Sequence, residues 1–285
     1  MNISLRLKIL STVGFRRIAG TFLVWFGGGW LLLEPAGLFF PNKLEFGWQG
    51  YISLVLLSLL GTIATRWPHI VIANKLSSPD SLVELKIGDL FEESAHLVIG
   101  TNDVFDTELG DVIKPGSVQG QFLTRVYQDD CTKLDTDIET ALSVLQCQKT
   151  EDLDKKMGKR IRYPVGTTIA LGSVEQRYFL TAYGRMGNDL KCESDSDALW
   201  FALSTLWEAV RLKGQGMPIA IPIVGSDLAR TNLPRMTLIR LILLSFVVAS
   251  KNEYVSQKLT VVIHPKDLGT LNYYSLQDCL MSACF

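Results

Sequence analysis

The chain has 285 residues, of which 47% are hydrophobic and 20% are charged, and its formal net charge is -1. This length allows one or two domains with a substantial core. Nucleic-acid binding, which needs a basic face to displace counterions from phosphates, is not supported by this charge balance. The five cysteines are scattered and lack CxxC spacing. They are therefore expected to be reduced thiols in a cytosolic domain, without disulfide or structural metal.

Two long apolar runs lie near the N-terminus, at residues 18–40 and 48–67. Each has the length of about 20 residues that a helix needs to cross a hydrocarbon core. The seven residues between them suffice only for a hairpin. Two comparable runs in succession differ from a secretory signal peptide, which has one short apolar stretch. We predict an N-terminal membrane anchor, residues 1–76, with transmembrane helices at about 18–40 and 48–67.

Basic residues lie on the outer flanks of these runs: Arg6, Lys8, Arg16 and Arg17 before the first, Arg66 and Lys75 after the second. The hairpin itself offers only Lys43. The positive-inside rule then predicts that both termini are cytoplasmic and that the chain crosses the membrane twice.

Glu34, the one acid in the first run, has two interpretations. An acid is costly in hydrocarbon unless it faces an interface, a bundle interior or a pore. Because Pro35 follows, the helix is expected to kink or end there, with Glu34 at the interface; the alternative is a role in an oligomer or pore. The glycines at 27–29 either permit close helix packing or form a flexible point.

The serine- and proline-containing turn at 77–81 predicts the start of a second domain, residues 77–285. Six short apolar, β-rich runs follow, beginning at Ser81, Ala95, Gly166, Arg177, Pro218 and Leu259. Helical periodicity fills the gaps at 135–149, at 195–214, and after Pro234, where Thr231 or Asn232 is the expected cap. This alternation predicts a layered α/β domain with a largely buried sheet.

Residues 218–236 run from a buried strand through a Gly-Ser-Asp turn into a helix. Backbone N–H groups converge at such a turn and the helix dipole favours an anion, so phosphate is the natural ligand. Arg230 and Arg235 add positive charge. Alternatively, Gly225 merely permits the turn and Asp227 caps the helix.

Polar residues also end two earlier strands: Gly-Asp at Asp89, and Asn-Asp at Asn102 and Asp103. Ligands bind at strand ends in α/β sheets. These side chains are equally suited to turns, where they bond the nearby backbone. The three histidines are far apart, and GxSxG, HExxH and Walker motifs are lacking, so neither a catalytic residue nor a metal site is predicted.

Taken together, residues 82–268 resemble the macro domain, a family that binds ADP-ribose. Asp89 and Leu90 match its Gly-Asp-Ile motif, whose aspartate holds the adenine amino group. Asn102 matches the strand-end asparagine that reaches the distal ribose, and PIVGSDLAR matches the pyrophosphate loop. The resemblance implies a three-layer α/β/α fold with a mixed central sheet. The implied ligand-binding residues are Asp89, Leu90, Asn102, Asp103, Gly166, Thr167, Gly225, Ser226, Asp227, Leu228 and Arg230.

Two departures from the family pattern bear on activity. The Gly-Gly-Gly-Val loop of hydrolytic macro domains is replaced by FDTELGDVIKPGSVQGQF, and the stacking aromatic of the pyrophosphate loop appears as Ala229. The resemblance therefore implies binding of ADP-ribose or a conjugate of it, without a cofactor and without enzymatic turnover.

The strings GTNDVFDT and PIVGSDLAR, after two transmembrane helices, resemble the macro-domain effectors of Thoeris antiphage defence. In those systems a partner TIR protein consumes NAD and makes an ADP-ribose-derived signal. The resemblance implies a multi-pass protein of the bacterial inner membrane with a cytoplasmic macro domain. It also implies a homo-oligomer that disrupts the lipid bilayer and aborts infection when the signal binds.

Three hypotheses follow. The first is a signal-gated membrane effector, in which the insert at 106–121 orders around the ligand. The second is a membrane-tethered ADP-ribosyl hydrolase, with Asp103 or Asp106 activating water. The third is a scaffold that binds no small ligand.

Overall fold

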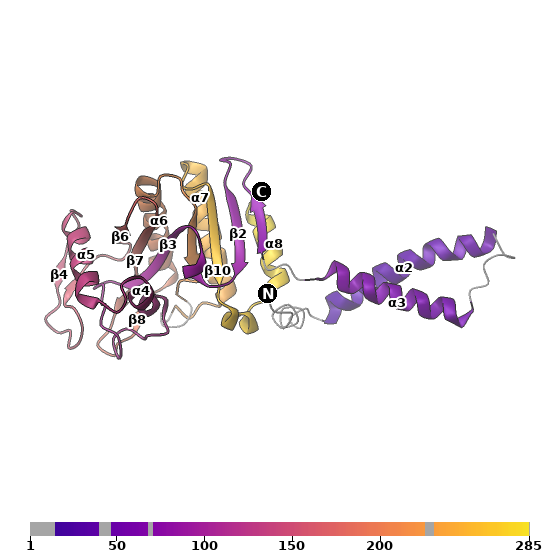
Figure 1. Ribbon diagram of the computed structural model, residues 1–285, viewed down its shortest axis with the longest axis horizontal. Coiled ribbons are helices and arrows are strands. Elements are labelled where there is room, and N and C mark those ends of the chain that lie inside the picture. The colour runs from indigo at the N-terminus through magenta and orange to yellow at the C-terminus, as the bar shows by residue number, and fades with distance from the viewer. Residues whose placement is uncertain (1–14, 40–46, 68–70, 226–230, 285) are drawn as a thin grey trace. The chain divides into compact units, whose positions relative to one another are not determined.

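The computed structural model describes residues 15–39, 47–67, 71–225 and 231–284. The chain divides into two compact units (Figure 1). The first comprises Met1–Ile70 with Leu271–Tyr274, and the second comprises Val71–Thr270 with Ser275–Phe285. The two units are described separately.

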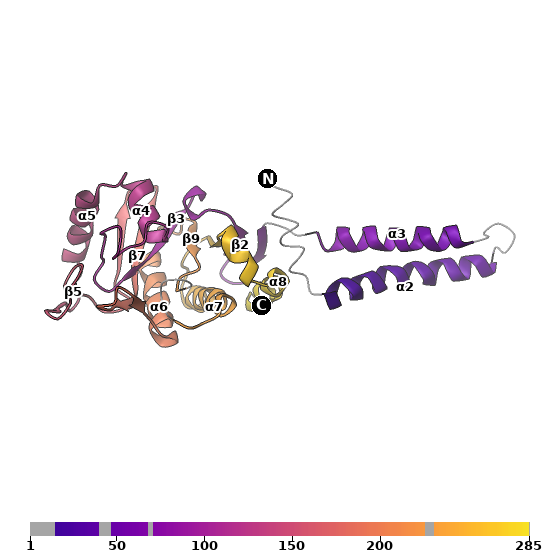
Figure 2. The same ribbon diagram turned by 90° about the horizontal axis from the view of Figure 1, so that it is seen from below.

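Two helices, α2 (Phe15–Phe39) and α3 (Trp48–Thr65), lie side by side as a hairpin (Figures 1 and 2). They lie where the two apolar runs predicted them. Both are long and apolar enough to cross a membrane by length and composition. Only 6% of the first apolar window and 17% of the second is buried, whereas a core helix of a soluble protein is mostly buried. Their exposed surface is apolar, with Leu23, Leu31, Leu32 and Leu57 all more than half exposed.

Two glycines let the helices approach closely. A Cβ at Gly29 would lie 2.5 Å from Leu54 Cδ1, and a Cβ at Gly61 would lie 2.5 Å from Trp25 Cδ2. At Gly27 and Gly28 nothing lies within 4 Å. Close packing is thus confirmed for one glycine of the predicted triplet, and the second contact comes from a glycine on the other helix.

Helix α2 continues past Pro35 to Phe39, so of the two expected outcomes at Pro35, a kink or an end, the end is not observed. Proline is tolerated inside apolar helices because local adjustments satisfy the freed carbonyl. Glu34 accepts a hydrogen bond of 3.0 Å from the Trp30 indole, one turn earlier. This bond satisfies one carboxylate oxygen on the same helix.

The second unit is built on a mixed sheet with strand order β1-β2-β10-β9-β3-β7-β6, and β8 pairs with β7. Its strands are β1 (Val71–Lys75), β2 (Leu82–Ile87), β3 (His96–Asn102), β6 (Thr168–Gly172), β7 (Arg177–Met186), β8 (Cys192–Glu193), β9 (Ile219–Pro222) and β10 (Lys258–Ile263). The five inner strands of the sheet are β2, β10, β9, β3 and β7, and they run parallel to one another. The outer strands β1 and β6 are antiparallel to their neighbours. All six predicted strands are present. Their continuous apolar runs are explained by burial on both faces.

Helices cover both faces of this sheet (Figure 2). Helices α4 (Val118–Val126) and α5 (Cys131–Ser143) cover one face, and α6 (Ser196–Lys213) and α7 (Arg235–Asn252) the other; α8 (Tyr273–Ala283) follows. Between α6 and α7, the rings of Trp207 and Phe246 meet edge to face at 5.3 Å. The Trp207 indole N–H donates to Ser245 Oγ at 2.8 Å. The predicted three-layer α/β/α fold is therefore confirmed.

The boundaries differ from the sequence-based expectation in three places. Strand β1 pairs with β2, so the sheet begins at Val71 and residues 77–81 are the turn between these strands rather than the junction of anchor and domain. Helix α5 begins at Cys131 because the Asp130 carboxylate accepts from the Lys133 N–H at 2.9 Å. Helix α7 begins after Pro234 without a side-chain cap. Thr231 instead donates to the Gly225 carbonyl at 3.1 Å.

Small elements complete the second unit. They are the 3-10 helices η1 (Leu90–Glu92) and η2 (Pro265–Thr270) and the two-stranded ribbon of β4 (Thr150–Glu151) and β5 (Ile161–Arg162). Helix α4 lies at the end of the insert that the sequence left without an element. Ser117 caps it by accepting from the Gly120 N–H at 3.0 Å.

We predict that Phe246→Ala lowers the free energy of unfolding of the second unit by about 3–5 kcal/mol, because it leaves a cavity beside Trp207. Val248→Ala, on the same helix but 48% exposed, is the control and should cost less than about 1 kcal/mol. Chemical denaturation of the detergent-solubilised chain measures both. Equal costs would contradict the assigned core.

Candidate functional site

The carboxyl ends of the parallel strands surround a cavity of about 590 Å³, which we call the strand-end cavity. Its walls include Asn102 after β3, Tyr183 on β7, Gly225 after β9 and His264 after β10. The insert at 111–121 supplies the opposite wall. Parallel strands direct their carboxyl ends to one edge of the sheet, which is why residues distant in sequence meet here. Asn102 and Gly225, predicted from separate motifs, therefore share one cavity.

Asn102 is buried and organises the turn that follows β3. Its Oδ1 accepts from the N–H groups of Val104 (3.2 Å) and Asp106 (3.1 Å), and its Nδ2 donates to Asp106 Oδ2 at 3.2 Å. These bonds use one of the two amide N–H groups. The turn and ligand interpretations of Asn102 are thus compatible, because its side chain forms the turn while the residue lines the cavity.

Asp106 forms an ion pair with Lys155 in which each side chain is only 1% exposed. Lys155 Nζ lies 3.2 Å from Asp106 Oδ2 and donates to the Met157 carbonyl at 2.7 Å. The other carboxylate oxygen accepts from the Lys159 N–H at 2.7 Å. Both oxygens are therefore occupied by protein donors, and the turn after β3 is fixed to the 155–159 segment.

Asp103 is held in the same way. Its two oxygens accept from Arg162 Nη1 at 2.6 Å and from the Met186 N–H at 2.8 Å. Arg162 also donates to Asp152 at 2.7 Å and to the Met186 carbonyl at 2.9 Å. Asp103 does not line the strand-end cavity. Its predicted ligand contact stays a prediction, while in the structure both of its carboxylate oxygens accept from protein donors.

Gly225 begins the predicted phosphate loop. Its φ of 83° lies in the left-handed region that favours glycine. A Cβ there would lie 3.2 Å from Thr231 Cγ2. Ile223 and Val224, just before it, also line the cavity. The remaining predicted loop residues lie outside the described residues: Ser226, Asp227, Leu228 and Arg230.

Asp89 follows β2 and caps η1, accepting from the Phe91 N–H at 2.9 Å. Its other oxygen accepts from Arg125 Nη1 at 2.5 Å, and the Arg125 guanidinium lies 4.9 Å from the centre of the Phe91 ring. Partial burial alone would raise the pKa of Asp89, but the hydrogen bonds from Arg125 and Phe91, with the charges of Arg125 and His264, hold that pKa below 3.8. Asp89 does not line the strand-end cavity, although the charge of the wall residue His264 contributes to lowering the Asp89 pKa. Leu90 is a buried core residue.

Gly166 and Thr167 contact α6 and the preceding turn rather than the cavity. The Gly166 carbonyl accepts from Thr205 Oγ1 of α6 at 2.8 Å, and a Cβ at Gly166 would lie 2.9 Å from the Phe201 ring. Thr167 Oγ1 donates to the Pro164 carbonyl at 2.7 Å. Neither residue lines the strand-end cavity, so the structure does not bring them to the other predicted site residues.

The N-terminus of α4 forms a cavity wall that the sequence patterns did not predict. Gly116, Ser117, Val118 and Gln119 all line the cavity there. The signal was present, because Pro-Gly-Ser ahead of an apolar-periodic segment is a helix start with a serine cap. The first N–H groups of a helix carry partial positive charge, so this wall suits an anion.

The cavity residues Gly100, Tyr183 and Cys192 were not predicted from the sequence either. Tyr183 packs over Gly100, where a Cβ would lie 2.7 Å from the tyrosine ring. Burial, with the charges of Asp103 and Glu193, raises the pKa of the Cys192 thiol to about 12, although its hydrogen bond with Tyr183 lowers that pKa. The thiol is therefore protonated at neutral pH and is not a nucleophile. In the described part of the chain, no three His, Cys, Asp or Glu side chains group as a metal site would require.

We predict that Lys155→Met destabilises the fold by about 3–5 kcal/mol, because Asp106 would remain buried without its partner. Adding Asp106→Asn should restore most of that loss, as measured by chemical denaturation. The control is Lys75→Met, which removes the exposed Lys75–Asp80 pair and should cost less than about 1 kcal/mol. If the Lys155 and Lys75 variants lose equal stability, the buried pair does not hold the turn.

We predict that Arg125→Gln raises the pKa of Asp89, measured by NMR titration of its carboxyl carbon. The folded pKa lies below 3.8, so the ionised carboxylate stabilises the fold above that pH. The stabilisation disappears as the pH falls through the folded value, and in the variant this loss moves to higher pH. Arg211→Gln, which removes a pair with Glu253, should leave Asp89 unchanged.

Comparison with known proteins places these features in a family. The family model described as the macro domain of Thoeris protein ThsA matches residues 83–264. The Thoeris protein ThsA of Bacillus amyloliquefaciens strain Y2 is 25% identical over 243 residues, which cover 79% of this chain and 78% of that protein.

Similar solved structures are distant in sequence. The Oceanobacillus iheyensis macrodomain with ADP is 14% identical with a TM-score of 0.46, covering 75% of this chain and 97% of that one. Thermosipho africanus DarTG in complex with ADP-ribose is 15% identical with a TM-score of 0.39, covering 69% of this chain and 47% of that one. The family-model match spans more than half of the chain, and the chain therefore belongs to the family of Thoeris ThsA macro domains.

Proposed function

We propose that this chain is a membrane-bound effector of antiphage defence that binds an ADP-ribose-derived signal in the strand-end cavity. The observation that carries the proposal is the convergence of Asn102, Gly225 and the α4 N-terminus on one cavity of about 590 Å³. This volume lies within the range of cavities that bind small molecules and cofactors. The family to which the chain belongs and the ADP-ribose bound by a distant structural neighbour are consistent with such a ligand.

The chemistry of the walls suits a nucleotide diphosphate with groups at both ends. The α4 N-terminus and the turn at Gly225 offer backbone N–H groups to phosphate oxygens. Lys114 and Lys266 line the same cavity and add positive charge. His264 lines the cavity and its charge lowers the Asp89 pKa, so that end is the proposed adenine side.

The opposite end is formed by the insert and the turn at 186–192. It combines apolar side chains with charged ones, namely Ile113, Leu190, Asp111, Asp189 and Lys191. Asp189 and Lys191 pair with each other at 3.0 Å. We assign this compartment to the group attached to the distal ribose, because Asn102, the residue proposed to reach that ribose, lines the same cavity.

Binding without hydrolysis is favoured by the hydrogen bonding of Asp103 and Asp106, the two candidate general bases. A general base must reach the water that it activates. Both oxygens of Asp103 and both oxygens of Asp106 accept hydrogen bonds from protein groups instead. The hydrolase hypothesis therefore lacks a poised carboxylate at either position.

In this proposal, signal binding acts on the part of the chain that lies in the lipid bilayer. In this proposal a TIR-domain partner supplies the signal, the macro domain lies in the cytoplasm with both termini, and copies of the chain assemble in the inner membrane. A ligand changes such an assembly only by binding one state more tightly than another. The insert at 106–121 lines the cavity and includes the start of α4. We propose that this insert is the element that differs between the states.

Gly225→Val is predicted to abolish ADP-ribose binding to the full chain in calorimetry, because the side chain would distort the turn at the cavity wall. Gly216→Val is the matched control, since Gly216 has a φ of 70°, a Cβ there would lie 3.1 Å from the Tyr254 ring, and Gly216 precedes β9 outside the cavity lining. It imposes the same backbone strain away from the cavity and should keep binding. Loss of binding in both variants would indicate general destabilisation and contradict the assignment.

The proposed link between binding and defence predicts that Asp227→Ala with Arg230→Ala abolishes both ADP-ribose-conjugate binding and phage protection in cells carrying the TIR partner. Protection that persists without binding would rule out the sensor role. Release of free product from ADP-ribosylated substrate by the unmodified chain would instead establish the hydrolase.

A further inference from the structure

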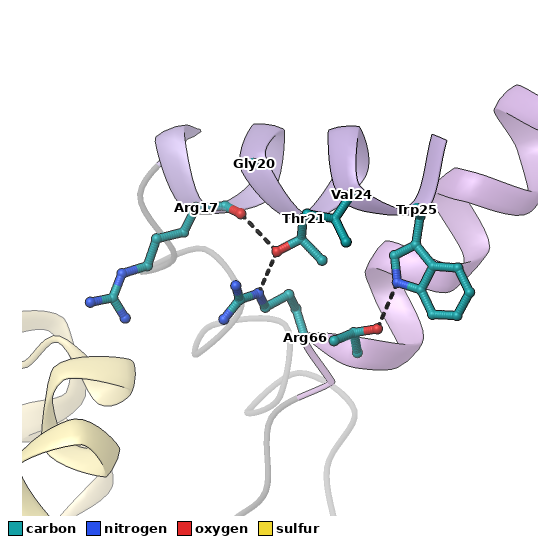
Figure 3. A pocket seen from close by; sticks show the side chains of 7 residues that line it. Arg17, Gly20, Thr21, Val24, Trp25 and Arg66 are labelled. Carbon is teal, nitrogen blue, oxygen red and sulfur yellow. Dashed lines mark hydrogen bonds between the residues drawn. The ribbon is translucent and has the colours of Figure 1, made fainter. Parts of the chain in front are cut away.

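A second cavity, of about 530 Å³, lies in the hairpin where α2 begins and α3 ends, and we call it the arginine cavity. It is lined by Arg17, Gly20, Thr21, Val24, Trp25, Thr65 and Arg66. Figure 3 shows the two guanidinium groups towards one end and the Trp25 ring at the other. The macro-domain function does not use this cavity.

Hydrogen bonds fix the arginine side of the cavity. Arg66 Nε donates to Thr21 Oγ1 at 2.8 Å, and Thr21 Oγ1 donates to the Arg17 carbonyl at 2.9 Å. Thr21 is only 8% exposed, and this bond orients Arg66 from α3 against α2. The bond uses the Nε–H of Arg66, whose two terminal nitrogens carry four further N–H groups in a planar fork. Such a fork is pre-organised for an oxyanion.

The aromatic side is equally fixed. The Trp25 indole N–H donates to Thr65 Oγ1 at 2.9 Å, and Thr65 Oγ1 donates to the Gly61 carbonyl at 2.7 Å. Gly61 lets the indole lie directly on α3. Val24 and Gly20 complete an apolar wall. The cavity therefore joins a cationic end to an apolar end.

We infer that the arginine cavity binds the phosphodiester head group of an anionic glycerophospholipid. Arginine binds phosphate oxygens through charge-assisted, often bidentate hydrogen bonds. Basic pockets between transmembrane helices at the cytoplasmic side bind anionic head groups, and tryptophan is enriched at that depth. The first methylenes of an acyl chain fit beside Trp25 and Val24.

This inference rests on the proposed insertion of the hairpin into a membrane with its arginine end at the cytoplasmic face. One phosphate held by Arg17 and Arg66 would connect the first helix to the second at that end. Such a lipid would stabilise the hairpin at the end from which the chain continues to the macro domain.

The test uses the full chain in nanodiscs of phosphatidylcholine with phosphatidylglycerol, with bound lipids counted by native mass spectrometry after transfer to detergent. The unmodified chain should retain phosphatidylglycerol over phosphatidylcholine. Arg17→Gln with Arg66→Gln should reduce that preference at least about tenfold, the change expected from losing one charge-assisted hydrogen bond. Thr21→Val, which keeps all charges, should reduce it partially.

Arg16→Gln is the matched control, because Arg16 is exposed, adjacent to Arg17 and not part of the lining. It should leave the preference unchanged. An equal effect of Arg16→Gln, or equal retention of the two lipids by the unmodified chain, would overturn the inference in favour of general surface charge. Displacement of the lipid by inorganic phosphate alone would overturn it in favour of a free-anion site.

The outcome separates this inference from the nucleotide function. Failure of the chain to enter nanodiscs would overturn the lipid site together with membrane insertion. ADP-ribose calorimetry on the same preparation reports the strand-end cavity independently. Retained nucleotide binding with no lipid preference would overturn the lipid site alone.

Discussion

The buried ion pair of Asp106 and Lys155 is the interaction on which the rest of the site depends. Removing two charges from water is costly, and that cost is offset here because every charged atom also has hydrogen-bonding partners. The pair joins residues 49 positions apart and fixes the turn that Asn102 begins. Arg162 and Asp103 repeat the arrangement beside it. These bonds hold the turn after β3 against residues 155–162.

The same hydrogen bonds determine which carboxylates are available for chemistry at the strand end. The two acids nearest the strand end, Asp103 and Asp106, are saturated by protein donors. The walls of the strand-end cavity combine backbone N–H groups, lysines and apolar side chains with other acids, among them Asp111 and Asp189. Under the proposed function, the N–H groups and lysines of these walls would bind the phosphate oxygens of the signal.

Local sequence patterns were sufficient for much of the fold. Continuous apolar runs predicted six of the inner and edge strands, because strands buried on both faces leave a strong signal, and the 195–214 periodicity predicted α6. Strand β1 was missed because a five-residue edge strand with polar positions resembles a loop. The N-terminus of α4 was missed because its cap lies inside a polar insert.

By itself the sequence determined the layered α/β class, the apolar hairpin, and two motifs whose residues, Asn102 and Gly225, line one cavity. It did so because hydrophobic periodicity and turn chemistry act over a few residues. Only the tertiary structure decided the roles of the acids. Lys155 and Arg162 lie in polar segments that predict solvent exposure, yet the fold buries them against Asp106 and Asp103. Contacts between residues so far apart in sequence arise from packing, which no local pattern encodes.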